Sequence, residues 1–234
     1  MTGTIINVVA IIVGGTLGIF FGSRLPDNMK KTVTAGMGLF VTALGVKMFL
    51  DTQNSLIVLG ALLIGALLGE WWQIEEGFQN LGIFFEKKFA GGDGSADDSR
   101  FVRGFLTASL IYCIGPISII GSIQDGMSGD YSLLAVKSVL DGFLSLAFAS
   151  TLGVGVIFSS LPILVYQGGI SLVAIQLNAI FTDLMMLEMT ATGGVILFGL
   201  GISSLLEIKK IRIGSFLPSL AVAPLIVYLL SLFP

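Results

Sequence analysis

The sequence contains no histidine, and this absence excludes several kinds of site at once. His-ligated zinc or copper, haem with a His ligand, and Ser-His or Cys-His dyads all require that residue. The single cysteine, Cys113, lies in an apolar run and has no partner for a disulfide within the chain. We expect it to act as a small buried hydrophobic side chain.

Charged residues are also scarce. They make up 12% of the chain, against about a quarter in an ordinary soluble domain. Hydrophobic residues make up 54%, and the mean hydropathy is +0.96. The formal charge of −3 argues against a nucleic-acid partner, because proteins that bind nucleic acid present basic faces. The composition therefore predicts an integral membrane protein whose main partner is the lipid bilayer.

Apolar runs long enough to cross a membrane recur along the chain. A crossing needs about 20 apolar residues, so up to about nine fit into 234 residues. No basic region precedes the first run and no convincing cleavage site follows it, which predicts a retained helix rather than a removed signal. The segments are 5–21, 34–50, 55–72, 101–123, 133–150, 151–165, 170–189, 194–206 and 213–233.

Two further stretches differ from these runs. Residues 73–89 alternate apolar and charged side chains at helical spacing, which predicts an amphipathic helix on the membrane surface. Residues 90–99 are rich in Gly, Asp and Ser and form the one stretch expected to be a flexible linker. We therefore predict an all-α fold over 1–234, a single transmembrane helical bundle of about seven to nine membrane segments.

The basic residues predict an orientation. Lys and Arg near residues 24–31, 87–103 and 209–212 should all face the cytoplasm, with the N-terminus outside. Five segments separate the last two groups, whereas an even number is needed to return to the same side. We therefore expect a broken or re-entrant element around 125–142 or 170–189. The predicted location is a bacterial cytoplasmic membrane, crossed several times.

Small residues recur at spacings of four. Gly14, Gly18 and Gly22 form one stripe, and Gly65 and Gly69 form another. Such faces let helices approach closely, either inside the bundle or in a homo-oligomer. A short match between Thr16-Leu17-Gly18 and Thr151-Leu152-Gly153 also suggests an internal repeat of 1–75 in 150–212, as in transporters built from repeats.

The strongest candidate site is the polar stretch between two apolar segments. It contains Gln124, Asp125, Ser128 and Asp130. Carboxylate and hydroxyl oxygens suit a hard cation such as Na⁺, with Asp125 and Asp130 as its ligands, or a proton carried by a carboxylate of raised pKa. A hydrated, glycine-rich loop is the other interpretation. Beyond such an ion, no cofactor is expected.

Further polar residues interrupt the later segments. Lys137 and Asp141 lie four residues apart and can pair on one helical face, or a bound cation can compete with Lys137 for Asp141. Gln167 either lines the same path or lies in an exposed turn. Glu188, Thr190 and Thr192 precede a glycine pair, which predicts either an anion-binding helix N-terminus or an ordinary helix cap.

Two short stretches of the chain partly match patterns of intramembrane proteases. Gly126-Met127-Ser128-Gly129 matches the rhomboid nucleophile pattern, but that chemistry needs a histidine base. Gly129-Asp130 partly matches the presenilin-type pattern, yet residue 127 is methionine where that pattern has glycine. We expect no enzymatic activity.

Four motifs occur in order along the chain: Gly3-Thr4-Ile5-Ile6-Asn7, residues 105–110, residues 121–130, and Glu188 to Gly194. Together they resemble a bacterial family of polytopic inner-membrane proteins catalogued as a domain of unknown function. This resemblance implies a membrane location and an all-helical fold, and no established activity.

These observations favour a transporter or channel for a small solute or ion. The alternative is a membrane scaffold or sensor that transports nothing, and an intramembrane enzyme comes third.

Overall fold

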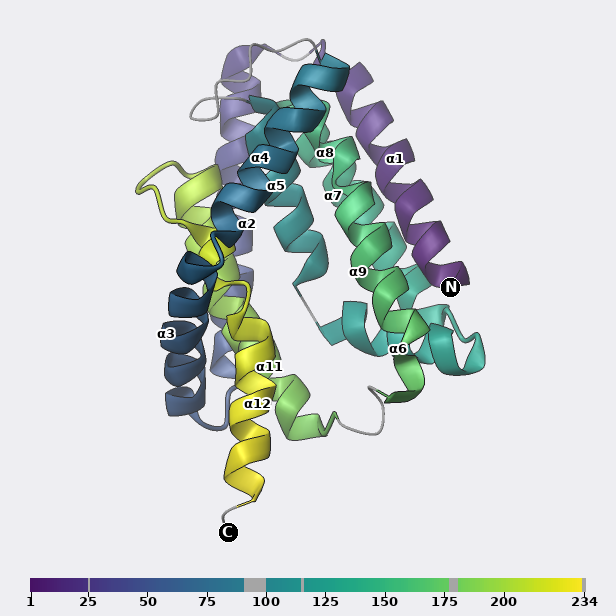
Figure 1. The fold of residues 1–234 in the computed structure, drawn as a ribbon. Coiled ribbons are helices and arrows are strands. Elements are labelled where there is room, and N and C mark those ends of the chain that lie inside the picture. Colours follow the sequence, from purple (N-terminus) through teal and green to yellow (C-terminus); the bar gives the residue numbers. More distant parts are fainter. Residues whose placement is uncertain (25, 91–99, 115, 177–180, 233–234) are drawn as a thin grey trace. The chain divides into compact units, whose positions relative to one another are not determined.

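The computed structural model describes the chain except residues 25, 91–99, 115, 177–180 and 233–234. All regular elements within the described residues are helices (Figure 1), which confirms the predicted all-α class. The predicted linker at 90–99 lies outside the described residues from residue 91 onward.

The helices form two compact units. Unit 1 comprises Met1–Thr34 and Gln79–Ala179, and unit 2 comprises Ala35–Phe78 and Ile180–Pro234. Unit 1 contains α1 (Thr2–Gly22), the π-helix η1 (Glu86–Ala90), α5 (Arg100–Cys113), α6 (Pro116–Ser128), α7 (Ser132–Leu152), α8 (Gly155–Phe158) and α9 (Ser160–Leu172). Unit 2 contains α3 (Ser55–Trp71), α11 (Asp183–Leu200), the π-helix η2 (Gly201–Leu205), the 3₁₀ helix η3 (Ile213–Phe216) and α12 (Ser219–Ser231). The chain passes between the units within α2 (Asp27–Leu50) and α4 (Ile74–Phe85).

Six helices within the described residues are long and apolar enough to cross a membrane, and the number rises to eight if two bent helix pairs each count as one crossing. The pairs are α3 with α4 and η1, and α5 with α6. These findings confirm a polytopic bundle with a broken element. The expected position of the break was wrong, because α7 runs without interruption through residue 142 and the bends lie elsewhere.

The eight-crossing count also resolves the problem of parity. Residues 170–189 are not a separate segment, because α9 ends at Leu172 and α11 begins at Asp183. Residues 183–205 form one candidate crossing, so four crossings, not five, separate the second and third basic groups. Alternating crossings then place all three basic connections on one side of the membrane, as the positive-inside rule requires.

The amphipathic stretch forms a helix of its own. α4 begins at Ile74 and is bent by 55° from α3. The bend follows Trp72, where Gln73 adopts the left-handed conformation at φ 53°. A non-glycine residue in this region interrupts regular helical geometry, so the change of direction is local to this residue.

In unit 1, α1 and α7 pack in parallel along a glycine face (Figure 1). A methyl group on Gly14 would lie 2.1 Å from the Gly142 carbonyl oxygen, and one on Gly18 would lie 2.3 Å from that of Leu146. The stripe therefore brings two backbones together inside the unit. Because this face is already covered, it does not support the predicted homo-oligomer.

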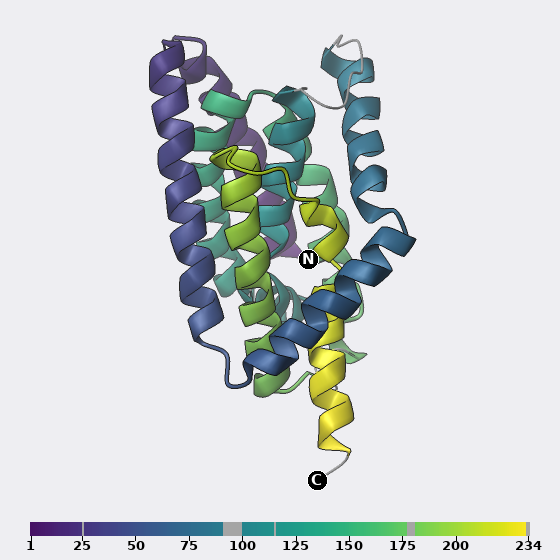
Figure 2. The same cartoon turned by 90° about the vertical axis from the view of Figure 1, so that its left-hand side faces the viewer.

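Unit 2 uses the same device between antiparallel helices. α12 lies against α3 (yellow and blue in Figure 2), where a methyl group on Gly65 would lie 2.2 Å from the Ser219 hydroxyl oxygen. A methyl group on Gly69 would lie 1.9 Å from the carbonyl oxygen of Ser215, in η3. α2 meets α11 where Gly45 approaches Gly194. The second predicted stripe is therefore also occupied within its own unit.

Candidate functional site

A buried ion pair lies in the first half of α7. Lys137 and Asp141 are 7% and 4% exposed, and the Lys137 ammonium donates to Asp141 Oδ2. The Lys137 Nζ atom also lies 5.9 Å from the centre of the Tyr112 ring on α5. The spacing of four residues places both groups on one helical face, which confirms the predicted pair.

Asn7 connects this pair to two other helices. Its side-chain nitrogen Nδ2 donates to Asp141 Oδ2 at 2.9 Å and to Gln167 Oε1 at 3.3 Å. Asn7 and Gln167 are both fully buried. Asn7, Lys137, Asp141 and Gln167 therefore form one polar cluster, to which α1, α7 and α9 contribute.

The same face of α1 makes polar contacts on either side of this cluster. The Gly3 amide donates to Asp125 Oδ2 at 3.0 Å, and the Met1 amino nitrogen lies 3.1 Å from Asp125 Oδ1. One turn beyond Asn7, the Ser145 hydroxyl donates to the Ile11 carbonyl oxygen at 3.0 Å. Further along α1, at Gly14, the contact with α7 is one of closely packed backbones.

Some polar atoms of this region have no hydrogen-bond partner among the described residues. They include Asn7 Oδ1, Gln167 Nε2 and Thr4 Oγ1, whose side chains are all fully buried. The Tyr112 hydroxyl and Asp125 Oδ1 also have no hydrogen-bond partner, although Asp125 Oδ1 lies 3.1 Å from the Met1 amino nitrogen. Buried polar groups are normally satisfied, and leaving one unmet costs about 1–3 kcal/mol. The polar cluster thus retains unused capacity for hydrogen bonding.

The predicted pairing of Asp125 with Asp130 was wrong. Asp125 is buried, whereas Asp130 is exposed in the connection between α6 and α7. Asp130 accepts hydrogen bonds from the Ser132 hydroxyl at 2.6 Å and the Ser132 amide at 3.0 Å, and these lower the pKa of its carboxyl. Its backbone precedes α7, so its carboxylate satisfies the first turn of that helix instead of a shared ion.

The neighbouring candidates also lie outside the cluster. Gln124 and Ser128 are exposed, and the Ser128 hydroxyl donates to the Gln124 carbonyl oxygen at 2.9 Å. Within the part of the chain that the structure describes, no group of three or more His, Cys, Asp or Glu side chains could hold a metal ion. Gln124 and Ser128 lie on the exposed face of α6, away from buried Asp125, so the polar residues that are adjacent in the sequence do not form one site.

Glu188 belongs to unit 2 and has a different role. Its carboxylate accepts hydrogen bonds from the Gln53 amide at 2.9 Å, the Asn54 amide at 3.0 Å and the Thr52 hydroxyl at 2.5 Å. Asn54 caps α3 by accepting a hydrogen bond from the Leu56 amide. The hydrogen-bonding groups at the start of α3 are therefore already used by the Glu188 carboxyl group.

The prediction of a helix N-terminus at Thr190 to Gly194 was also wrong. α11 begins at Asp183, and its cap is Thr182, whose side chain accepts from the Met185 amide. The Thr190 and Thr192 hydroxyls donate to the carbonyl oxygens four residues earlier. Because helical hydrogen bonding continues through this stretch, its backbone amides are not available to a substrate.

Asn7 and Thr4 were not among the site residues predicted from the sequence. Both lie in the otherwise apolar segment 5–21 or just before it, and an amide side chain within a membrane helix is a signal in itself. Their role becomes visible only when α1 packs against α7.

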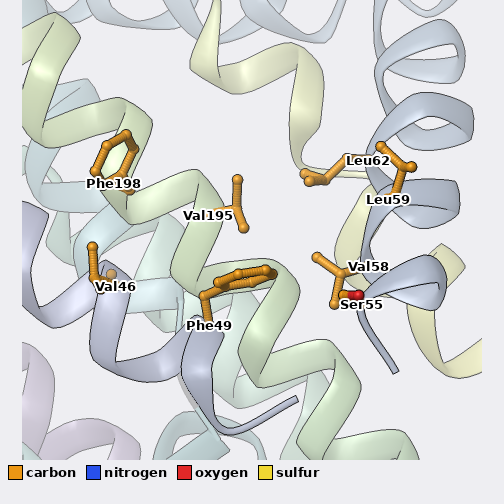
Figure 3. Close-up of a pocket in the computed structure, with 9 residues that line it drawn as sticks. Val46, Phe49, Ser55, Val58, Leu59, Leu62, Val195 and Phe198 are labelled. Carbon is orange, nitrogen blue, oxygen red and sulfur yellow. The ribbon is translucent and has the colours of Figure 1, made fainter. Parts of the chain in front are cut away.

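Unit 2 also contains an apolar cavity of about 380 Å³ between α2, α3 and α11 (Figure 3). Phe49, Val58, Leu62 and Phe198 are among its lining residues, and Ser55 supplies a side-chain hydroxyl. Such a lining offers shape and dispersion contacts but almost no hydrogen bonding. It does not resemble a site for an ion or a polar solute.

Comparison with known proteins gives the family but no activity. Residues 2–228 match the family model described as "Protein of unknown function (DUF554)". The uncharacterized membrane protein YdfK of Bacillus subtilis is 34% identical over 238 residues, covering 100% of this chain and 98% of that protein. The uncharacterized protein YqgA of Escherichia coli is 29% identical over 221 residues, covering 94% of each. No solved structure matches the chain. The chain belongs to the DUF554 family of membrane proteins.

Proposed function

We propose that this protein transports a small solute or ion across a bacterial cytoplasmic membrane and holds it at the polar cluster of unit 1. The observation that carries this proposal is the buried Lys137–Asp141 pair in the first half of α7. The multiple candidate crossings and the similarity to bacterial proteins support the location.

Stability alone does not account for the pair. A charged side chain at the centre of a bilayer costs about 3 kcal/mol on insertion scales. Replacing a buried ion pair with apolar residues of similar volume is often neutral or stabilising. A charged cluster inside an apolar helix therefore favours a functional role, because an apolar pair would fold at least as well.

The position of the cluster suits transport. Substrate sites of many transporters are formed where helices from different parts of the fold meet. Asn7, Asp141 and Gln167 come from three helices, so a movement of α1, α7 or α9 changes the cluster. An ion transported here would compete with Lys137 for Asp141, whereas an uncharged solute would leave the pair intact.

The test uses the intact protein reconstituted in liposomes. Proton flux is followed with a pH-sensitive dye, ion flux with ion-selective dyes, and uptake of neutral solutes by light scattering. The informative variant is Lys137→Met/Asp141→Leu, which removes both charges without leaving one unpaired. We expect parent-like thermal stability in detergent and loss of the measured flux.

The scaffold interpretation makes the opposite prediction. If the parent protein moves none of the probes, or if the double variant moves them at the parent rate, the proposal fails. Exposed Asp130→Asn provides a control that removes one charge outside the cluster.

A further inference from the structure

We propose that the transported solute is a small uncharged molecule that both donates and accepts hydrogen bonds, in the chemical class of water, polyols and simple amides. This inference rests on the transport function proposed above and specifies its substrate class. It follows from two properties of the polar cluster: its charges are already balanced, and its unpaired atoms are neutral.

The charge balance excludes a net-charged ligand as the best fit. Asp141 is paired with Lys137, and the Asn7 amide adds a second donor to the same carboxylate oxygen. Asp125, a buried acidic side chain of α6, already contacts the Gly3 amide and the Met1 amino nitrogen. An added cation or anion would leave one buried charge without a counter-charge, which is strongly unfavourable in an apolar interior.

The unpaired atoms favour a neutral ligand with both functions. The Asn7 Nδ2 protons are occupied by Asp141 and Gln167, so Asn7 presents Oδ1 as an acceptor. Gln167 uses Oε1 to accept from Asn7 and presents Nε2 as a donor. A ligand with a hydroxyl group or a primary amide can donate a hydrogen bond to Asn7 Oδ1 and accept one from Gln167 Nε2.

Thr4 adds a third contact. It lies three residues before Asn7, on the same side of α1, and its hydroxyl has no partner among the described residues. A hydroxyl can donate or accept, so it fits the same class of ligand. If Thr4 serves only the fold, replacing this unpaired hydroxyl with a methyl group should have no effect on flux.

The experiment measures light scattering by proteoliposomes after rapid mixing. Inward gradients of urea, glycerol and erythritol report solute entry, and impermeant sucrose reports water efflux alone. We expect faster movement of at least one of these molecules than in protein-free liposomes. Gln167→Leu should slow it about tenfold, and Thr4→Val, which conserves shape, about threefold. Gln176→Leu, at an exposed position, is the matched control and should leave the rate unchanged.

The outcomes separate this inference from the proposed function. Movement of water alone, slowed by Gln167→Leu, supports the class and restricts it to water. Proton or ion flux that requires Lys137 and Asp141, without neutral flux, overturns the neutral class and leaves transport intact. Equal neutral flux in the Gln167→Leu, Thr4→Val and Gln176→Leu proteins overturns the site, and no flux of any probe overturns both proposals. Gel filtration and thermal melting confirm that each variant is folded.

Discussion

Asn7 connects three helices through one side chain. It donates two hydrogen bonds, to Asp141 and to Gln167, from a fully buried position. We predict that Asn7→Leu lowers the free energy of unfolding by about 1–3 kcal/mol, because the buried oxygens of Asp141 and Gln167 each lose a hydrogen-bond donor. Unfolding in mixed detergent measures this change. Gln176→Leu should stay within about 0.5 kcal/mol of the parent, and an equal loss in both variants would contradict the proposed role.

The Lys137–Asp141 pair should show strong coupling. Each single variant, Lys137→Met or Asp141→Leu, leaves one buried charge and should cost about 3–5 kcal/mol. The double variant should unfold near the parent free energy, so its cost should be far below the sum of the two single costs. A double-mutant cycle measures this difference. Additive costs would show that the two side chains act independently.

Asp130 predicts a pH dependence at an exposed position. Hydrogen bonds from the Ser132 hydroxyl and amide lower the pKa of its carboxyl from the ordinary 3.8. A depressed folded-state pKa adds stability above the unfolded pKa, and this stability disappears as the pH falls through the folded pKa. The melting temperature of Asp130→Ala should therefore lie below that of the parent at pH 7, with the gap closing below pH 3.8. A gap that persists in acid would contradict this assignment.

At the scale of elements, the contact of α1 with α7 depends on the absence of side chains. A methyl group on Gly14 would lie 2.1 Å from a backbone oxygen, which a rotamer change cannot relieve. Gly14→Ala should therefore destabilise the protein by about 1–3 kcal/mol. Gly36→Ala is the matched control in α2, because nothing lies within 4 Å of the added methyl group. It should stabilise the helix by up to about 1 kcal/mol, and thermal melts that rank the two variants otherwise would contradict the packing.

The sequence did not predict every helix start correctly. Thr190 and Thr192 are of a residue type that often caps helices, yet α11 begins seven residues before Thr190, at Asp183, because Thr182 provides the cap. A threonine inside a helix can return its hydroxyl to the backbone, so the type of residue does not identify the cap by itself. Asp130 was assigned to an ion for a related reason: a carboxylate next to a helix start also satisfies backbone amides.

At the scale of the whole molecule, the eight-crossing count predicts opposite sides for two connections. One candidate crossing, α5 with α6, separates residues 129–131 from the preceding basic residues, and three candidate crossings separate them from the basic residues at 206–212. Both numbers are odd, so residues 129–131 lie on the opposite side from the basic connections. In a Cys113→Ala background, Asp130→Cys should be labelled by an impermeant thiol reagent added outside cells. Lys209→Cys should be labelled only after the membrane is opened. Labelling of both from outside would contradict the topology.

The sequence alone determined the class of the protein. Its low charge indicates a chain that lies in a bilayer, and its long continuous apolar runs indicate helices, in which every backbone group is paired within its own segment. It also determined the Lys137–Asp141 pair, since both groups lie on one helix and a spacing of four is local geometry. Tertiary structure decided which other polar residues join them. Asn7 and Gln167 are 160 positions apart, and only the packing of α1 between α7 and α9 brings their side chains together. The same packing left Asp130 at the surface, although it stands five residues from buried Asp125 in the sequence.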